Sequence, residues 1–113
     1  MSKYGTKELN LLNIQIGCEL KLARLKKKIS QEDLGLSIDA DKTKIARLER
    51  NASNWNTIYL VSQELNVDFR SLFTLKSKKD ILSLIDECKK EDSKLTATKV
   101  KYYEDLKKTI LRY

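Results

Sequence analysis

The chain has 113 residues, of which 41% are hydrophobic and 35% are charged. That length allows one small domain with at most an appendage, which excludes a protein of several large domains. The formal net charge of +7 favours a polyanionic partner, although cationic surfaces also serve solubility or bind acidic proteins. Proline is absent, glycine is rare, and Lys, Leu, Ile and Glu dominate, so we expect an all-α fold.

Residues 9–28 are predicted to form a long helix with two apolar stripes. At about 100° per residue, the stripes fall on opposite sides of this helix. One contains Leu9, Leu12, Ile16, Leu20 and Ala23, and the other contains Leu11, Ile14, Cys18, Leu22 and Leu25. A helix that is apolar on two sides is usually sandwiched, so two different parts of the chain are needed to cover it.

The segment SQEDLGLSIDADKTKIARLER, residues 30–50, is predicted to form two short helices separated by a turn at Asp39. Each half has apolar residues at helical spacing: Leu34 and Ile38 in the first, Ile45 and Leu48 in the second. Ser30 and Asp41 precede the two stripes, and their side-chain oxygens can cap the free backbone N–H groups of a helix start. The apolar pattern therefore stops and starts again because the chain turns.

A further helix is expected to begin near Asn54 or Asn56 and to end at about Leu65. Its inward face contains Thr57, Ile58, Val61 and Leu65. Trp55 lies at its start, where packing in the core is a commoner role than stacking on a base. The stretch FRSLF follows, and five helices in all are predicted for residues 9–73.

Residues 74–113 are predicted to add two more helices. The first, within 74–90, has an apolar face of Ile81, Leu84, Ile85 and Cys88. The second follows the polar stretch EDSKLTA and has Val100, Tyr103, Leu106, Ile110 and Tyr113 at spacings of three and four. Two such helices have too little core to fold alone, so we expect a domain of residues 1–73 and a C-terminal helical extension of residues 74–113.

The sequence gives little support for enzyme chemistry, a cofactor or a metal. It has no histidine, no G-x-S-x-G and no glycine-rich phosphate loop, and its carboxylates are scattered among lysines. Cys18 and Cys88 lack CxxC spacing and are interpreted as small buried residues in a reducing compartment. Neither a membrane-length apolar run nor a signal-peptide pattern is present, which predicts a cytoplasmic protein.

The run from Ile16 to Asn51, followed by TIYLVSQELNVDFRSLF, resembles the phage-repressor-like (Cro/C1, or XRE) helix-turn-helix domains. The similarity covers about residues 14–73. It is carried by Ile16, Gly17, Leu20, Arg24, Ile29, Ser30, Gln31, Leu34, Ile45, Glu49, Leu65, Val67, Leu72 and Phe73. The resemblance implies a five-helix DNA-binding bundle, in which the helix within 41–50 lies in the major groove and the helix within 30–38 lies across the backbone.

The resemblance also implies roles for individual residues. Gly35 stands where the family keeps a small residue because two helices cross there. Asp39 and Asn51 replace two glycines of the family, and both residue types tolerate the left-handed backbone region. Arg24 and Glu49 match a pair that commonly forms a structural salt bridge.

DNA contacts are implied at nine positions, with Arg47 as the residue best suited to read guanine O6 and N7. Lys44 is expected to read a base or to bind phosphate. Gln31, Ser53, Asn54 and Thr57 are expected to bind phosphates through side-chain and backbone donors. The complete set is Gln31, Asp41, Lys42, Thr43, Lys44, Arg47, Ser53, Asn54 and Thr57.

The implied function is sequence-specific binding of double-stranded DNA by a small transcriptional regulator, with repression as the commoner mode. An alternative is an antitoxin whose C-terminal segment neutralises a toxin while its N-terminal domain represses the operon. A protein adaptor that uses the fold only as a scaffold is disfavoured by the cationic residues 42–50.

The C-terminal extension is expected to pack against the stripe of Leu11, Ile14, Cys18, Leu22 and Leu25, because both surfaces need cover. A two-fold dimer on a pseudopalindromic operator would place two recognition helices about 34 Å apart. The expected dimer interface is Tyr103, Leu106, Ile110 and Tyr113, formed with or without exchange of helices between chains. In the alternative interpretation this stripe packs only on its own chain.

Overall fold

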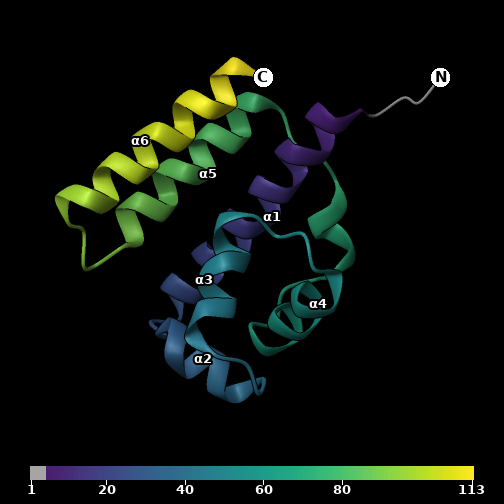
Figure 1. Cartoon of the computed structure of the whole chain (residues 1–113), viewed down its shortest axis with the longest axis vertical. Helices are drawn as coiled ribbons and strands as arrows, with labels where there is room; N and C mark the ends of the chain where they lie inside the picture. The colour runs from purple at the N-terminus through teal and green to yellow at the C-terminus, as the bar shows by residue number, and fades with distance from the viewer. Residues whose placement is uncertain (1–4) are drawn as a thin grey trace.

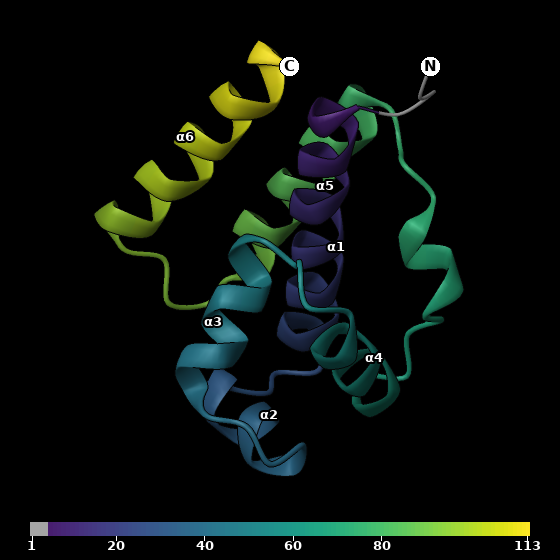
Figure 2. The same ribbon diagram turned by 45° about the vertical axis from the view of Figure 1, so that its right-hand side comes forward.

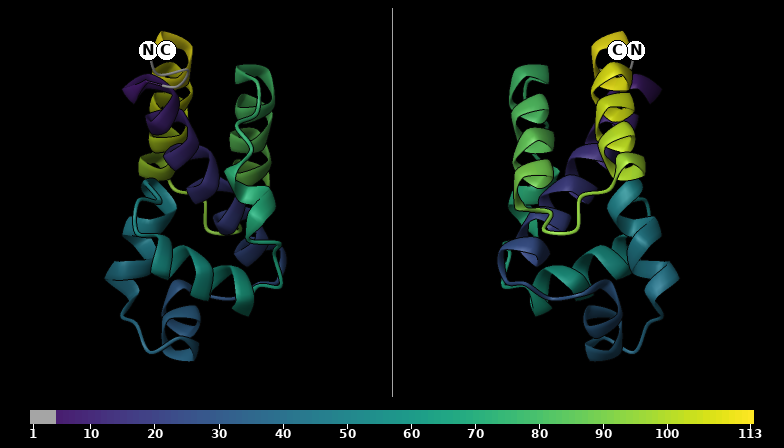
Figure 3. Two further views of the ribbon diagram at one scale, coloured as in Figure 1. Left: turned by 90° about the vertical axis from the view of Figure 1, so that its right-hand side faces the viewer. Right: turned by 90° about the vertical axis from the view of Figure 1, so that its left-hand side faces the viewer.

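The computed structural model describes residues 5–113, which fold into six α-helices and one short 3-10 helix (Figure 1). In chain order these are α1 (Thr6–Lys26), α2 (Gln31–Ser37), α3 (Lys42–Arg50), α4 (Trp55–Glu64), the 3-10 helix η1 (Arg70–Phe73), α5 (Lys78–Glu91) and α6 (Ala97–Arg112). No strand occurs in this part of the chain, so the all-α prediction is confirmed for it. Figure 3 shows α5 and α6 at one end of the molecule and α2, α3 and α4 at the other, with α1 running between the two groups.

Residues 9–73 contain four α-helices and η1, instead of the five α-helices that the sequence predicted. In η1 the hydrogen bonds are local: the Arg70 N–H donates to Asp68 Oδ1 at 3.3 Å and the Ser71 hydroxyl donates to the Asp68 carbonyl at 2.8 Å. Such side-chain bonds compete with a continuing helical ladder and keep the turn short. Both predicted helix caps are confirmed, because Ser30 and Asp41 accept backbone N–H groups at 3.0 and 2.7 Å.

One hydrophobic core lies between α1 and the helices of residues 31–73. Its buried members are Ile16, Leu20, Leu34, Ile45, Leu48, Ala52, Ile58, Val61, Leu65 and Leu72. The first apolar stripe of α1 therefore faces α2, α3 and α4, as its spacing predicted. Leu9 is the exception, since its side chain is 56% exposed near the start of α1, beyond the helices that cover the rest of the stripe.

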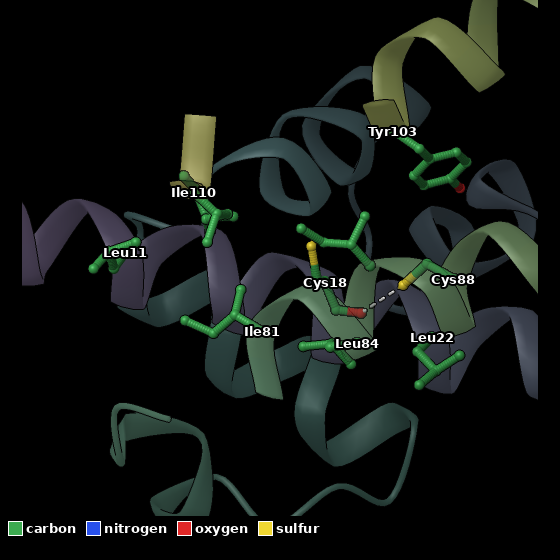
Figure 4. Close-up of a cluster of buried hydrophobic side chains, with 10 residues drawn as sticks. Leu11, Cys18, Leu22, Ile81, Leu84, Cys88, Tyr103 and Ile110 are labelled. Atoms are coloured by element: carbon green, nitrogen blue, oxygen red, sulfur yellow. Dashed lines mark hydrogen bonds between the residues drawn. The ribbon is translucent and has the colours of Figure 1, made fainter. Parts of the chain in front are cut away.

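A second hydrophobic core joins the opposite side of α1 to α5 and α6. It contains Leu11, Ile14, Cys18, Leu22, Ile81, Leu84, Ile85, Cys88, Tyr103 and Ile110 (Figure 4). The Cys88 Sγ–H donates to the Cys18 carbonyl at 3.3 Å, and both cysteines are free and buried. Residues 78–112 thus cover the stripe that the first core leaves open, which is the arrangement expected from the two-sided pattern of α1.

The structure changes the interpretation of the stripe on α6. Tyr103 and Ile110 are buried in the second core, and Leu106 and Tyr113 pack against it with part of their surface exposed. These residues therefore have intrachain partners in the second core, and only Leu106 and Tyr113 keep surface that a second chain could contact. A dimer that uses the whole stripe would require α6 to exchange between chains, as one form of the expected interface does.

The connection between η1 and α5 is attached to α1 by Gln15, which the sequence did not single out. The Gln15 side chain is fully buried, and its Nε2 donates to the Thr74 carbonyl at 2.8 Å. Its Oε1 accepts the Lys76 N–H at 2.8 Å, and the Lys76 ammonium pairs with Glu19 at 2.7 Å. A single amide therefore satisfies two backbone groups of the linker and sets where α5 begins on α1.

The loop between α5 and α6 is organised by Asp92. Its carboxylate accepts the Tyr103 hydroxyl at 3.0 Å, the Lys94 N–H at 3.2 Å and the Lys99 ammonium at 3.3 Å. Burial alone would raise the pKa of Asp92, but these hydrogen bonds and the Lys99 charge lower that pKa below its ordinary value. Burial and the nearby Asp92 carboxylate raise the pKa of Tyr103, so its hydroxyl stays a donor.

We therefore expect Asp92 to contribute to stability in its ionised form. A carboxyl group with a lowered folded-state pKa stabilises the fold above its unfolded pKa of about 4, and that contribution is lost as pH falls further. Asp92→Asn should accordingly lose less stability than the wild-type chain between pH 6 and pH 3. Urea denaturation followed by circular dichroism at both pH values measures this, and an equal loss in the two proteins would contradict it.

Candidate nucleic-acid interface

The helix α3 separates its cationic residues from its apolar ones. Lys42, Thr43, Lys44 and Arg47 are exposed, whereas Ile45 and Leu48 are buried in the first core. Arg50 is also exposed, and the acidic Glu49 is buried. The solvent-facing side of α3 is therefore a row of positive charge and hydrogen-bond donors, with its one carboxylate turned inward.

The turn between α2 and α3 has the geometry expected from its sequence. Asp39 has a φ of 57°, in the left-handed region that this residue type tolerates. The Ala40 N–H donates to the Gly35 carbonyl at 2.8 Å, which brings the turn against α2. A Cβ atom on Gly35 would lie 2.6 Å from the Ala40 carbonyl oxygen, so the small residue is required at this close approach.

The C-terminal end of α3 rests directly on α1 at Gly17. A Cβ atom there would lie 2.7 Å from the Glu49 carbonyl oxygen and 2.8 Å from that of Leu48. The resemblance included Gly17 but did not imply this steric role for it. The sequence did contain a sign of this contact. A glycine inside a helix costs about 1 kcal/mol of stability relative to alanine, so its presence there usually marks a close packing contact.

The ion pair expected between Arg24 and Glu49 is present and buried. Arg24 Nε lies 2.5 Å from Glu49 Oε2, and Arg24 Nη2 lies 3.1 Å from Glu49 Oε1. The remaining terminal nitrogen, Nη1, donates to the Ile29 carbonyl at 2.8 Å. Arg24 and Glu49 are only 7% and 4% exposed, so the pair links α1, the start of α2 and the end of α3 with little competition from water.

Gln31 has a structural contact that the sequence analysis did not predict. Its Nε2 donates to Glu49 Oε1 at 2.9 Å, which ties the first residue of α2 to the end of α3. A phosphate contact from this half-buried side chain would have to use its other amide hydrogen. In the structure, Gln31 is therefore a hydrogen-bond partner of the Arg24–Glu49 ion pair.

Asp41 likewise acts within the fold. Its exposed carboxylate accepts the Lys44 N–H at 2.7 Å and caps α3, a contact that was expected from its position. A carboxylate repels phosphate, so the role of Asp41 in the structure is to cap the first turn of α3.

The segment between α3 and α4 matches the expectations only in part. Ser53 and Asn54 are exposed, but Asn54 caps α4 by accepting the Thr57 N–H at 3.3 Å. Thr57 is 5% exposed and its N–H is occupied by Asn54, so its contacts lie within the fold, and the phosphate contact expected of it stays a prediction. Asn51 has an extended backbone with φ of −157°, not a left-handed one, because the next N–H, that of Ala52, donates to the Asn13 carbonyl of α1 at 3.1 Å.

Trp55 differs most from its expected position. Packing in the core was expected, yet the Trp55 side chain is 63% exposed at the first residue of α4. The inward positions of this helix are taken by Thr57, Ile58 and Val61, which leaves Trp55 and Asn56 on the surface.

The described residues contain no group of His, Cys, Asp and Glu that could hold a metal ion. Within the same part of the chain, no helix is both long enough and apolar enough to cross a membrane. Comparison of the chain with models of protein families, with curated proteins and with solved structures gave no significant match.

Proposed function

We propose that this protein binds double-stranded DNA in a sequence-specific manner and acts as a transcriptional repressor in the cytoplasm. The proposal takes α2 and α3 as a helix-turn-helix of the phage-repressor-like kind, with α3 in the major groove and α2 across the backbone. The observation that carries it is the surface of α3, where Lys42, Lys44 and Arg47 are exposed together while the apolar residues and Glu49 face inward.

The way in which α3 is held supports this proposal. Its start is capped by Asp41 and fixed by the turn at Asp39, and its end lies on Gly17 and in the Arg24–Glu49 ion pair. Residues that read base edges need a rigid support, because ordering a mobile segment on binding lowers the affinity.

Charge supports a nucleic-acid partner as well. The solvent-facing residues of α3 include four basic side chains and no acidic one, on a chain with a net charge of +7. We assign Arg47 to base reading, Lys44 to a base or a phosphate, and Lys42, Thr43, Ser53 and Asn54 to the backbone. Phosphate contacts of this kind make the affinity fall as the salt concentration rises.

The test is selection of bound duplexes from a random pool with the intact protein. We expect one enriched motif, and we expect Arg47→Ala to lose the base preference at one position of it, at a cost of about 1–3 kcal/mol on the preferred sequence. Arg112→Ala, which removes an exposed arginine from α6, is the matched control and should enrich the wild-type motif. A pool that shows no enrichment, or an identical motif from Arg47→Ala, would contradict these assignments.

A further inference from the structure

One side of α1 contacts the end of α3 at two points. Gly17, Lys21 and Arg24 are separated by four and three residues, so they share this side of the helix. A Cβ atom on Gly17 would lie 2.7 Å from the Glu49 carbonyl oxygen, and Arg24 pairs with the Glu49 carboxylate. Lys21 therefore lies between two contacts of α1 with α3. Figure 2 shows α3 and α6 on the same side of α1, with α3 running toward α6.

The half-buried Lys21 also contacts α6. Its Nζ lies 4.6 Å from the ring centroid of Tyr103 and 5.3 Å from that of Tyr102. Such a cation–π contact holds the ammonium group in place and leaves its charge intact. Within residues 5–113, neither Lys21 nor Arg50, the exposed last residue of α3, forms an ion pair. Both cations are therefore free to bind an anion.

Tyr102 differs from its neighbour Tyr103 in the use of its hydroxyl. The Tyr103 hydroxyl donates to Asp92, whereas that of Tyr102 has no hydrogen-bond partner in the described part of the chain. Burial raises the pKa of Tyr102 to about 12, although the nearby Arg50 charge acts to lower it, so the hydroxyl keeps its proton at neutral pH. Tyrosine hydroxyls, like lysine and arginine, are common donors to DNA phosphates.

Positive charge prevails around Tyr102. Two buried carboxylates act on the tyrosines of α6, those of Glu49 and Asp92, and each pairs with a basic residue. The exposed Asp105 of α6 is one acidic group against the two cations Lys21 and Arg50. An anion is therefore favoured at this place, where α1, α3 and α6 each supply one donor.

The cluster lies at the end of the surface assigned to base reading. Thr43, Arg47 and Arg50 are spaced by four and three residues, so they share the exposed side of α3. This side is about 10 Å long, and the major groove is about 12 Å wide. A helix that reads base edges with its first turns therefore reaches the phosphates at the edge of the groove with its last turn.

We propose that Lys21, Arg50 and Tyr102 together bind one phosphate of the DNA backbone at the edge of the groove that α3 reads. The ammonium of α1, the guanidinium of α3 and the hydroxyl of α6 are its three donors. The C-terminal extension thereby takes part in DNA binding. This inference rests on the proposed function, because it places α3 in the major groove.

The affinity of the intact chain for its selected duplex and for a shuffled duplex, measured by fluorescence anisotropy at several salt concentrations, tests the contact. A phosphate contact carries no sequence information, so Arg50→Ala and Lys21→Met should each weaken binding to both duplexes by about tenfold at low salt. Each should also reduce the slope of log affinity against log salt by about 1. Methionine keeps an apolar side chain on the two tyrosine rings, and circular dichroism verifies that every variant is folded.

Tyr102→Phe removes a hydroxyl and no charge. We therefore expect it to weaken binding to both duplexes by about fivefold without changing the salt slope. The matched controls lie at the other end of α6. Arg112→Ala removes an exposed arginine and Tyr113→Phe removes a hydroxyl, and both should bind like wild type.

Wild-type affinity in any of Arg50→Ala, Lys21→Met or Tyr102→Phe would overturn the inference. So would a loss confined to the selected duplex, because that would show base reading and not a phosphate contact. Either result, with a wild-type chain that prefers its selected duplex, leaves the proposed function intact. A wild-type chain that selects no duplex would overturn the proposed function and this inference together.

Discussion

Replacing Arg24 with alanine is expected to lower the free energy of unfolding by about 3–5 kcal/mol, because it strands a buried charge. Glu49 is 4% exposed and would keep only the Gln31 amide as a side-chain partner. The Ile29 carbonyl would lose the Arg24 Nη1 donor at the same time. Equilibrium unfolding in urea, followed by circular dichroism, measures the change.

The matched control is Arg112→Ala, which removes an exposed arginine from α6 and should change stability by no more than about 0.5 kcal/mol. Arg24→Lys is a useful intermediate, because it keeps the charge but loses the planar pair of N–H groups that contacts both oxygens of Glu49. If Arg24→Ala proved as stable as the wild-type chain, the ion pair would have no structural role.

Gly17→Val is the second substitution from which we expect a large effect, about 3 kcal/mol of destabilisation, at the upper end of the usual cost of overpacking. Helix propensity favours valine over glycine by a few tenths of a kcal/mol, but this gain is too small to offset the clash. The new Cβ would meet the Glu49 and Leu48 carbonyl oxygens at 2.7 and 2.8 Å, and these are backbone atoms that move only if α3 moves.

Gly5→Val is the control for this substitution. A Cβ at Gly5 meets only the flexible end of the Glu8 side chain, at 3.4 Å, and the backbone there is already extended. Its cost should not exceed about 1 kcal/mol, the usual value of a helix cap. Thermal unfolding of the two variants compares them directly, and similar melting temperatures would show that α3 does not rest on Gly17.

Local chemistry explains what the sequence predicted well. A cap depends on one side chain and the next few backbone groups, so Ser30 and Asp41 could be recognised without knowing the fold. Helical periodicity fixes which residues share a side of α1. The two apolar stripes therefore predicted that two different parts of the chain cover this helix. Both cores have the expected members of α1, apart from Leu9 and the half-buried Leu25.

The misses concern contacts between segments distant in the sequence. Gln15 binds the backbone of Thr74 and Lys76, some 60 residues away, and no local sequence pattern predicts these contacts. Trp55 is exposed because of how α4 is rotated on the core, which the spacing of apolar residues at a helix end leaves open. For the stripe on α6, periodicity showed that cover was needed but did not show which surface provides it.

The central claim is that the exposed side of α3 reads a DNA sequence. The most direct measurement is the affinity of the intact protein for its selected duplex and for a shuffled duplex of the same composition, at one fixed salt concentration. A sequence-reading interface predicts a preference of about a thousandfold or more for the selected duplex. Equal affinities, falling together as salt is added, would show a protein that binds only the phosphate backbone and would contradict the claim.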